Sequence, residues 1–392
     1  MRKKRVLLLS EGFGAGHTRA AHALSRSLKR LSPHIQTRVF ELGSFLNPTI
    51  APWILAAYRI TVSARPRFMG MVYRYQYNKS INRISSLALH RIFYTQTLNM
   101  IRQLKPDVIV CTHPIPNAVI SRLQRLGLHD IPIVTLITDY DAHATWITPE
   151  VHSYLISTPE VKTKMLQHSV PLSKIVVTGI PVHPDFWQQH NKEEIRARYG
   201  LKDMPTVLMM GGGWGLMNHS KLIEFMTRWR KNIQFIFCLG NNEKARKKLA
   251  AEPRLQHEHV HLLGYTHEID KLMEVSDLLI TKPGGITCTE GLVKGIPMLF
   301  FAPLPGQEEE NCHYFTEHGY GEPIRSLDTV AEWMVRLSQD WEHLRHIRQE
   351  HMGNIERFHP TACAEAILNL LGQETHGMYP RPLRNEVRIV DA

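Results

Sequence analysis

The chain has 392 residues, which is too long for one ordinary domain and predicts two domains of roughly 180 residues each. Hydrophobic residues make up 43% of the sequence, and no run of ~18 apolar residues is free of charge, so we expect a globular protein without a transmembrane helix. The net charge is +11, but no nucleic-acid recognition motif accompanies it, which excludes a nucleic-acid partner. Five widely spaced cysteines without a Cys-x-x-Cys pair predict reduced cytosolic thiols and no metal site.

The N-terminal segment predicts a strand, a glycine-rich loop and a helix. The apolar run Val6 to Leu9 is too short for a signal peptide, so we interpret Arg5–Ser10 as the first strand and Thr18–Leu31 as the following helix. The loop between them places Gly14, Gly16 and His17 at the helix start, on the predicted acceptor side. A helix N-terminus disfavours a protonated histidine, so His17 is either a neutral catalytic base or a structural histidine bonded to a carbonyl.

A basic, aromatic-rich stretch follows the second strand, Thr37–Leu42. From Leu42 to Pro106 there is no Asp or Glu. Cations interleaved with aromatic rings are typical of proteins that contact anionic lipid, because the rings settle at the headgroup level. The alternative is a solvated basic face with its aromatics packed inward. The residues predicted to face the membrane are Trp53, Arg59, Arg65, Arg67, Tyr73, Arg74, Lys79 and Arg83.

The rest of the first half reads as alternating helices and buried strands. Polar residues follow the strand Ile133–Thr138, and ligands of parallel sheets bind at such carboxyl ends. Asp139 is therefore a candidate base or orienting group, and Trp146 a candidate on the acceptor side; His113 reads rather as a structural loop histidine. The predicted helices are Asn82–Leu104, Asn117–Leu126 and Pro159–Ser169, and the other strands are Asp107–Cys111, Tyr154–Ser157 and Ile175–Thr178.

A proline-rich turn at Gly179–Pro184 predicts the domain junction, so residues 1–182 form the first domain and 183–372 the second, with a loose tail at 373–392. The second domain begins with the helix Lys192–Tyr199 and the strand Thr206–Met210. Glycines directly after that strand, including Gly212 and Gly213, predict an anion-binding turn. The further strands are Ile233–Leu239 and Val260–Leu263, and Val330–Leu371 is predicted to be helical with a break at Pro360.

The stretch from Leu278 to Pro305 predicts a strand, a glycine turn, the helix Ile286–Lys294 and the strand Met298–Phe301. Free N–H groups at such a helix start hold anions. Glu290, one turn further on, is placed to accept both hydroxyls of a ribose. The predicted donor-binding residues are Gly212, Gly213, Lys282, Gly284, Gly285, Thr287 and Glu290, with Gln307, Glu308 and Asn311 for the sugar. Two doubly wound α/β halves therefore face each other across a cleft, the donor in the second half and the acceptor in the first.

These motifs resemble the family of the plant monogalactosyldiacylglycerol synthases and the bacterial processive diacylglycerol glucosyltransferases. The resemblance runs from about Val6 to about Leu371. It rests on GAGH, TDYDAHATWITPEVHSYLIST, KIVVTGIPVHPDF, MGGGWG, LGYTHEIDKLMEVSDLLITKPGGITCTE and PLPGQEEEN.

The resemblance implies a GT-B fold and an inverting transfer of glucose or galactose from a UDP-sugar to diacylglycerol or a glycosyl-diacylglycerol, without a metal or other cofactor. It also implies that His17 or Asp139 takes the proton. Gly284, Gly285 and Thr287 match the diphosphate turn, Glu290 the ribose carboxylate, Gln307 and Glu308 the sugar side, and Gly212 and Gly213 the second donor turn. The Gln-Glu pair replaces the Gln-Gln of the related peptidoglycan enzyme, which disfavours N-acetylglucosamine.

We therefore expect a peripheral enzyme on the cytoplasmic face of the cell membrane, with anionic lipids and diacylglycerol as partners. Two alternatives use the same fold: a UDP-sugar epimerase and a UDP-sugar-binding sensor without activity. The epimerase needs no membrane surface, and the sensor needs neither His17 nor Asp139. The sequence gives no oligomeric state.

Overall fold

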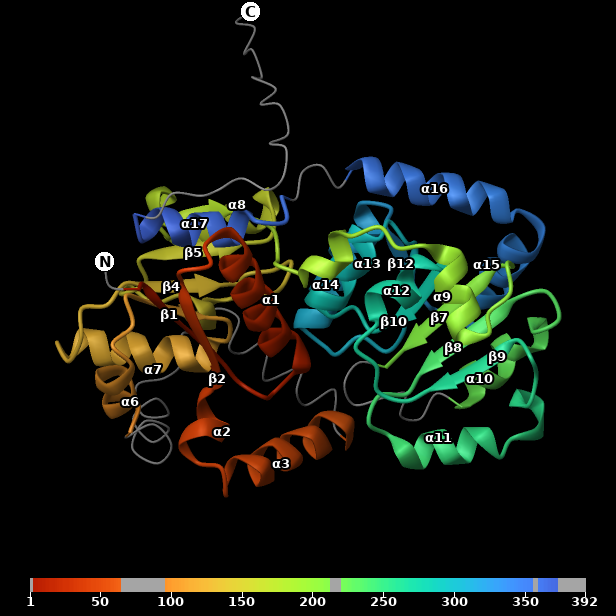
Figure 1. Cartoon of the computed structure of the whole chain (residues 1–392), viewed down its shortest axis with the longest axis horizontal. Helices are drawn as coiled ribbons and strands as arrows, with labels where there is room; N and C mark the ends of the chain where they lie inside the picture. The colour runs from red at the N-terminus through yellow and green to blue at the C-terminus, as the bar shows by residue number, and fades with distance from the viewer. Residues whose placement is uncertain (1–2, 65–95, 212–219, 355–358, 373–392) are drawn as a thin grey trace, which may run out of the picture.

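A computed structural model describes residues 3–64, 96–211, 220–354 and 359–372. Two parallel six-stranded sheets, each with helices on both faces, form two halves of the molecule (Figure 1). The strand order is β2-β1-β3-β4-β5-β6 in the first sheet and β12-β11-β10-β7-β8-β9 in the second. Both orders reverse direction next to the first strand of their half, which makes each sheet doubly wound. The predicted α/β class with two doubly wound halves is confirmed.

The first sheet consists of short strands whose apolar runs are buried. Its central strands are almost fully buried, as continuous Val, Ile and Leu runs predict for a parallel sheet covered on both faces. The strands are β1 (Arg5–Ser10), β2 (Gln36–Glu41), β3 (Val108–Cys111), β4 (Ile133–Leu136), β5 (Ser153–Ile156) and β6 (Ile175–Val177). The helices are α1 (Ala15–Leu31), α2 (Leu42–Leu46), α3 (Ala51–Ala64), α6 (Thr97–Leu104), α7 (Pro114–Arg125) and α8 (Pro159–Gln167).

The second sheet follows the same logic. Its strands are β7 (Thr206–Met210), β8 (Gln234–Cys238), β9 (Val260–Leu263), β10 (Leu278–Thr281), β11 (Met298–Phe300) and β12 (Gly321–Pro323). Its helices are α9 (Lys192–Tyr199), α10 (Ser220–Met226), α11 (Glu243–Ala250), α12 (Ile269–Glu274), α13 (Gly285–Val293), α14 (Gln307–Glu317), α15 (Leu327–Gln339) and α16 (Trp341–Asn354). Side-chain caps begin several of these helices, such as Asn191 on α9 and Asn242 on α11.

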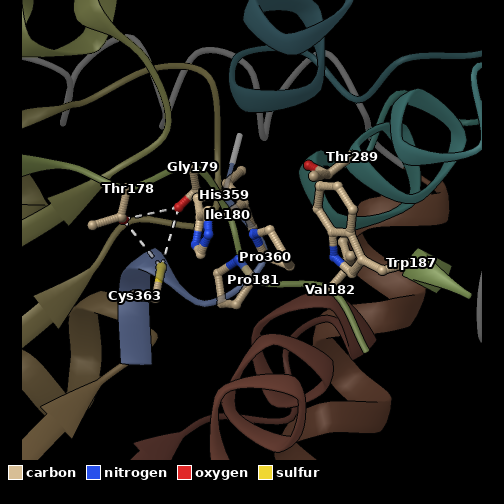
Figure 2. A pocket seen from close by; sticks show the side chains of 10 residues that line it. All are labelled: Thr178, Gly179, Ile180, Pro181, Val182, Trp187, Thr289, His359, Pro360 and Cys363. Carbon is tan, nitrogen blue, oxygen red and sulfur yellow. Dashed lines mark hydrogen bonds between the residues drawn. The ribbon is translucent and has the colours of Figure 1, made fainter. Parts of the chain in front are cut away.

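The last helix, α17 (Ala362–Leu370), returns to the first half and packs against α1 (Figure 1). Its Cys363 thiol lies 3.1 Å from Thr178 Oγ1 and 3.3 Å from the carbonyl oxygen of Gly179, in the segment that joins the halves (Figure 2). The predicted second domain, 183–372, includes this helix. The chain thus crosses between the halves twice, and the division at residue 182 stays a prediction, as does the tail 373–392 outside the described residues.

Some predicted elements differ from the structure. Within the predicted helical stretch Val330–Leu371, the break at Pro360 is confirmed, since α17 begins at Ala362, but a further break at Asp340, which separates α15 from α16, was not predicted. The described part of the predicted helix Asn82–Leu104 is α6, and the short strand β12 was not predicted. Helix α1 begins at Ala15 rather than Thr18, so His17 lies inside its first turn.

Within the described residues, no helix is long and apolar enough to cross a membrane. Three buried apolar clusters hold the molecule together, and the largest contains side chains from both halves. Residues of α1, such as Leu24 and Leu28, share this cluster with residues of α13 and α17, such as Leu292 and Ile367. The two halves are therefore joined by a common core as well as by polar contacts.

Candidate functional site

The predicted site residues converge where the carboxyl ends of the first sheet meet the N-termini of α13 and α14. Gly16 at the start of α1 approaches Ile286 of α13: a Cβ on Gly16 would lie 3.6 Å from Ile286 Cγ1. Gly14 is the N-cap of α1 and adopts an extended conformation. The glycine-rich loop of the first half thus packs directly against the predicted donor turn of the second half.

His17 is fixed between the loop and the strand that carries Asp139. Its Nδ1 lies 2.7 Å from Thr138 Oγ1, the residue immediately before Asp139. Burial lowers the pKa of His17 to about 4, and a hydrogen bond with the backbone of Thr112 partly opposes this shift. His17 is therefore neutral at physiological pH, as its place at a helix start predicts. A neutral imidazole in this position can accept a proton.

Two further histidines and a tryptophan surround His17. The ring of His113 lies edge-on to it at 4.7 Å between centroids, and His113 Nδ1 accepts a hydrogen bond from Ile115 N at the start of α7. The sequence interpretation of His113 as a structural loop histidine agrees with this N-cap. The ring of Trp146 lies 6.1 Å from His17 but is 1% exposed within the core of the first half. Trp146 thus packs inside the first half next to His17, and its predicted place on the acceptor side stays a prediction.

Asp139 follows β4 and is buried, yet both of its carboxylate oxygens have partners from the second half. Oδ2 accepts a hydrogen bond from Gln307 Nε2, and Oδ1 accepts one from Asn311 Nδ2 at 3.2 Å. Burial raises the pKa of Asp139 to about 7; the two amides lower it, and the charges of Asp141 and Glu308 raise it further. A carboxylate with a pKa near neutrality is suited to general-base catalysis.

Tyr140 was not predicted as a site residue, although it links the halves most closely. Its backbone N–H donates to Asn311 Oδ1 at 2.8 Å, and its hydroxyl lies 2.9 Å from Thr289 Oγ1. Its ring stacks on Tyr314 at 4.5 Å and meets Phe315 edge-on. The position of Tyr140 between Asp139 and Asp141, directly after a buried strand, is the feature of the sequence that could have indicated it. The side chain anchors the Asp139 segment between α13 and α14.

The start of α13 gives its two glycines different roles. A Cβ on Gly285 would lie 2.1 Å from the carbonyl oxygen of Thr138, whereas a Cβ on Gly284 would meet nothing within 4 Å. The sequence interpretation assigned both glycines to close approach by a ligand. In the structure, Gly285 allows the first half to approach, and the open side of the turn is at Gly284. Thr287 is half-buried in this first turn, while the Thr289 hydroxyl donates to Gly285 O at 2.6 Å.

Glu290, one turn into α13, is 2% exposed and forms an ion pair with Arg19 of α1. Burial raises the pKa of Glu290 to about 7, while the charge and hydrogen bond of Arg19 lower it. Sequence reasoning missed Arg19, because an arginine on a helix face is ordinarily a solvated charge. The structure shows that this face of α1 is turned toward α13 of the second half.

The segment before α14 holds the predicted sugar-side residues. Glu308 Oε2 accepts the Leu304 N–H at 2.7 Å, so this carboxylate also shapes the loop. Burial raises the pKa of Glu308, and the charge of Lys282 opposes that shift, which places Lys282 beside it. Asn311 also donates to Pro283 O at 3.1 Å and so connects Asp139 with the donor turn. Gln307, Glu308, Asn311 and Lys282 thus lie together with Asp139.

A second ionic link crosses the cleft beside this cluster. Lys164 Nζ, on α8, lies 2.6 Å from Asp141 Oδ1 and 3.2 Å from Glu310 Oε2 of α14. Asp141 is 1% exposed, so this ion pair lies largely inside the protein. The link between Lys164 and these two carboxylates was not predicted, because Asp141 and Glu310 come from distant segments of the sequence.

Some predicted residues lie outside the described part of the chain: Gly212, Gly213, Arg65, Arg67, Tyr73, Arg74, Lys79 and Arg83. Their roles stay predictions. Arg59 lies within α3, and Trp53 on the same helix is 78% exposed. Phe45 and Ile50, which flank the turn between α2 and α3, are each 48% exposed. Large apolar side chains therefore face outward at the start of the basic stretch.

Two family models match the chain in succession. Residues 17–182 match the model described as monogalactosyldiacylglycerol (MGDG) synthase, and residues 191–352 match glycosyl transferases group 1. The first match contains His17 and Asp139, and the second contains the α13 and α14 turns. The chain is thus a glycosyltransferase whose first half matches the MGDG synthases and whose second half matches the group 1 glycosyltransferases. The family predicted from the sequence motifs is confirmed.

Curated relatives of this MGDG-synthase-type chain extend over its full length. It is 28% identical to the "processive diacylglycerol beta-glucosyltransferase" of Staphylococcus carnosus, with 96% of this chain and 97% of the relative covered. The protein of the same name from Bacillus subtilis is 28% identical, with 96% of each chain covered. These matches include both halves and the segment that joins them.

Solved structures share the fold of the MGDG-synthase-type chain at low sequence identity. MurG of Acinetobacter baumannii superposes with a TM-score of 0.59 at 16% identity, covering 94% of this chain and 99% of that structure. Anabaena HepE in complex with UDP-glucose gives 0.59 at 14% identity, with the same coverage. A UDP-GlcNAc 2-epimerase of Neisseria meningitidis gives 0.58 at 15%. The predicted GT-B fold is confirmed, and the likeness to an epimerase shows that the fold alone does not fix the reaction.

Proposed function

We propose that this glycosyltransferase transfers a hexose from a UDP-sugar to diacylglycerol or a glycosyl-diacylglycerol, with inversion, to form a β-linked glycolipid. One observation carries the proposal beyond family membership: Asp139 of the first half is hydrogen-bonded by Gln307 and Asn311 of the second half. A candidate base thus meets the candidate sugar-binding residues across the cleft. The names of the curated relatives favour glucose as the sugar.

The acceptor is activated by removal of its hydroxyl proton. An alcohol has a pKa far above neutral, so a base must take the proton as the oxygen attacks the sugar C1. Asp139, with a pKa raised to about 7, and His17, neutral with a pKa of about 4, are both able to accept it. We favour Asp139 as the proton acceptor and His17 as its neighbour that orients the acceptor, because the higher pKa makes the stronger base.

The departing UDP carries negative charge that the start of α13 is placed to hold. The N–H groups at Gly284, Gly285 and Thr287 and the positive end of the helix dipole act together at this turn. Lys282 adds a positive charge beside it, and Gly212 and Gly213 are proposed to form a second anion turn. Glu290 is proposed to bind the ribose. UDP-glucose or UDP-galactose is a substrate, and we propose no resident cofactor.

The exposed apolar residues of α2 and α3 support contact with a lipid surface. The two helices follow each other at one end of the first half (Figure 1), and Phe45 of α2, Trp53 of α3 and Ile50 in the turn between them are exposed. A tryptophan ring inserts at the headgroup level, and the cations that follow in sequence attract anionic lipid. We propose that this end holds the enzyme peripherally on the cytoplasmic face of the cell membrane, next to diacylglycerol.

The proposed function is tested by product analysis with diacylglycerol in anionic liposomes, offering UDP-glucose and UDP-galactose in separate reactions. Glycolipid from one donor identifies the sugar, and the number of sugars on the lipid shows whether transfer is repeated. UDP-sugar conversion without any acceptor would support an epimerase instead. Tight UDP binding with no product from diacylglycerol or a panel of lipid alcohols would support a sensor.

A further inference from the structure

The ribose-binding candidate Glu290 has one occupied and one unoccupied carboxylate oxygen. Oε1 accepts a hydrogen bond from Arg19 Nη2, and Oε2 is buried without a hydrogen-bond partner among the described residues. A buried carboxylate oxygen normally has a partner, because leaving it unsatisfied costs roughly 1–3 kcal/mol. Oε2 is thus the atom of Glu290 that remains available to a ligand hydroxyl.

Arg19 comes from the opposite half of the molecule. It lies in the second turn of α1, directly after the glycine-rich loop, and its side chain is 40% exposed while that of Glu290 is 2% exposed. Gly16, three residues earlier, packs on Ile286 of the same helix that carries Glu290. The contact between α1 and α13 therefore fixes the direction from which the guanidinium reaches the carboxylate.

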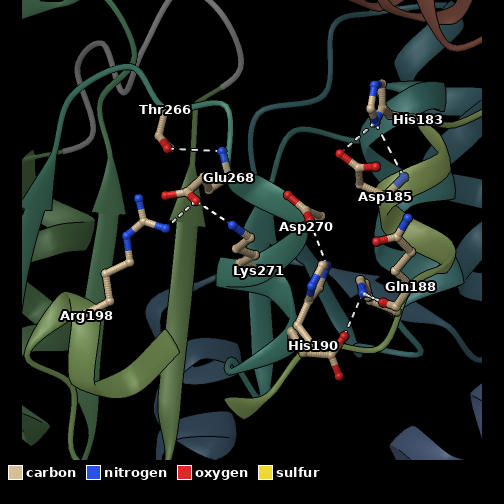
Figure 3. A network of polar contacts seen from close by, with 11 residues as sticks. His183, Asp185, Gln188, His190, Arg198, Thr266, Glu268, Asp270 and Lys271 are labelled. Atoms are coloured by element: carbon tan, nitrogen blue, oxygen red, sulfur yellow. Dashed lines mark hydrogen bonds and ion pairs between the residues drawn. The ribbon is translucent and has the colours of Figure 1, made fainter. Parts of the chain in front are cut away.

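Among the influences on Glu290, the contact with Arg19 favours the ionised form of the carboxyl group. Burial and the charge of Asp270 from α12 raise its pKa, and Arg19 is the cation that lowers it, leaving a value of about 7. Asp270 is itself 2.9 Å from His190 Nε2 in the segment that joins the halves (Figure 3). The Cys288 thiol on α13 is the other titratable group that interacts with Glu290. Without Arg19, only the influences that raise the pKa of Glu290 would remain.

We propose that Arg19 is a positioning residue for the nucleotide donor: its ion pair fixes Oε1 of Glu290, so that Oε2 faces the ribose hydroxyls. This inference rests on the proposed ribose role of Glu290 and adds a residue of the acceptor half to it. An ionised carboxylate is purely an acceptor, and each of its oxygens has two lone pairs, so Oε2 alone can accept hydrogen bonds from both hydroxyls of a ribose. Ribose recognition is therefore complete only when α1 and α13 are in contact.

The test compares the affinities of UDP and 2′-deoxy-UDP for the full-length protein by calorimetry at pH 6.5 and pH 8.5. The two ligands titrate at the same phosphates, so the ratio of their affinities reports on ribose recognition alone. We expect about a tenfold preference for UDP in the wild type at pH 8.5, as for a hydrogen bond to a charged group, and a smaller preference at pH 6.5, where more of Glu290 is protonated. Arg19→Met should reduce the ratio to near one at pH 6.5 and restore part of it at pH 8.5. Arg19→Lys, which keeps the charge, should retain most of the preference.

A double-mutant cycle separates the inference from the function on which it rests. Glu290→Gln should lose the preference at both pH values, and Arg19→Met combined with Glu290→Gln should be no worse than Glu290→Gln alone. Arg26→Met, an exposed arginine on the same helix, is the control and should match the wild type. An unchanged ratio in Glu290→Gln would overturn the ribose role itself. Two outcomes would overturn the role of Arg19. In one, the preference for UDP disappears in Glu290→Gln but is normal in Arg19→Met. In the other, the double variant loses more affinity for UDP than Glu290→Gln alone, as expected for independent residues.

Discussion

The contact between Gly285 and Thr138 predicts that a single methyl group at residue 285 blocks the approach of the two halves. A Cβ there would lie 2.1 Å from the Thr138 carbonyl oxygen and 3.3 Å from Asp139 Cα. Carbon atoms of this kind do not approach other atoms closer than 3.0 Å, so in Gly285→Ala α13 must move by at least 0.9 Å. The neighbour is backbone, not a flexible side chain, and has no rotamer that relieves the clash.

We expect Gly285→Ala to lower turnover about 100-fold, because a displacement of roughly 1 Å between reacting groups costs about that factor. The mid-point of thermal unfolding should fall as well, since overpacking in a tight contact costs about 1–3 kcal/mol. Turnover is measured with the donor and acceptor identified by product analysis. The radius of gyration from X-ray scattering, which should increase if the halves separate, gives an independent readout.

Two other glycines, Gly284 next to Gly285 in sequence and Gly264 further away, serve as controls for this prediction. Gly284→Ala adds a methyl group that contacts nothing within 4 Å, so the unfolding temperature and radius of gyration should match the wild type. In Gly264→Ala the new Cβ would lie 3.7 Å from Glu243 Oε1, an ordinary contact, so this variant is the control for turnover at a glycine away from the site. Wild-type turnover in Gly285→Ala, or an equal loss of stability in Gly284→Ala, would refute the assignment of Gly285 to the contact between the halves.

Three further predictions concern the base, the core and the membrane surface. With the Asp139 pKa at about 7, turnover should fall as the pH drops below 7. Asp139→Asn should lower the rate by about 10²–10⁴, abolish this decrease at low pH and leave the affinity for UDP unchanged. If the variant still shows the decrease, another group is responsible for it. The buried Arg348 side chain donates to the carbonyls of Lys294, Ser276 and Met273. Arg348→Met should therefore lower the free energy of unfolding by about 3–5 kcal/mol, measured by urea unfolding, whereas Arg26→Met should change it little. Trp53→Glu should weaken binding to anionic liposomes in a sedimentation assay without changing the unfolding temperature, and undiminished binding would remove α3 from the membrane surface.

The sequence was sufficient for the buried strands with continuous apolar runs and for Asp139, though not for the short strand β12. Runs such as Val108–Cys111 and Leu278–Thr281 are apolar throughout, as fully buried parallel strands must be. Asp139 was predicted because a polar residue directly follows such a run, and the structure places it beside Gln307 and Asn311. The order of strands within each sheet did not have to be known to find these positions.

Residues whose role depends on contact between the halves were not predictable in this way. Arg19 and Lys164 have the sequence context of solvated helix charges, and only the packing of α1 and α8 turns them toward Glu290 and Glu310. Gly285 has the sequence context of a ligand turn, but its missing side chain admits Thr138. Helix α17 likewise packs on α1 through pairings distant in sequence, which local patterns do not encode.

The hydrogen bonds to Asp139 suggest how closure and proton transfer are coupled. The amides of Gln307 and Asn311 stabilise the ionised carboxylate and so lower its pKa against the effect of burial. An acceptor hydroxyl must give its proton to Oδ1 or Oδ2, and each oxygen keeps a second lone pair beside its amide partner. If the donor sugar draws the Gln307 amide to its own hydroxyls, Asp139 loses a stabilising donor and becomes the stronger base. The carboxylate would then gain basicity only when the sugar is in place, which favours transfer to the lipid over reaction with water.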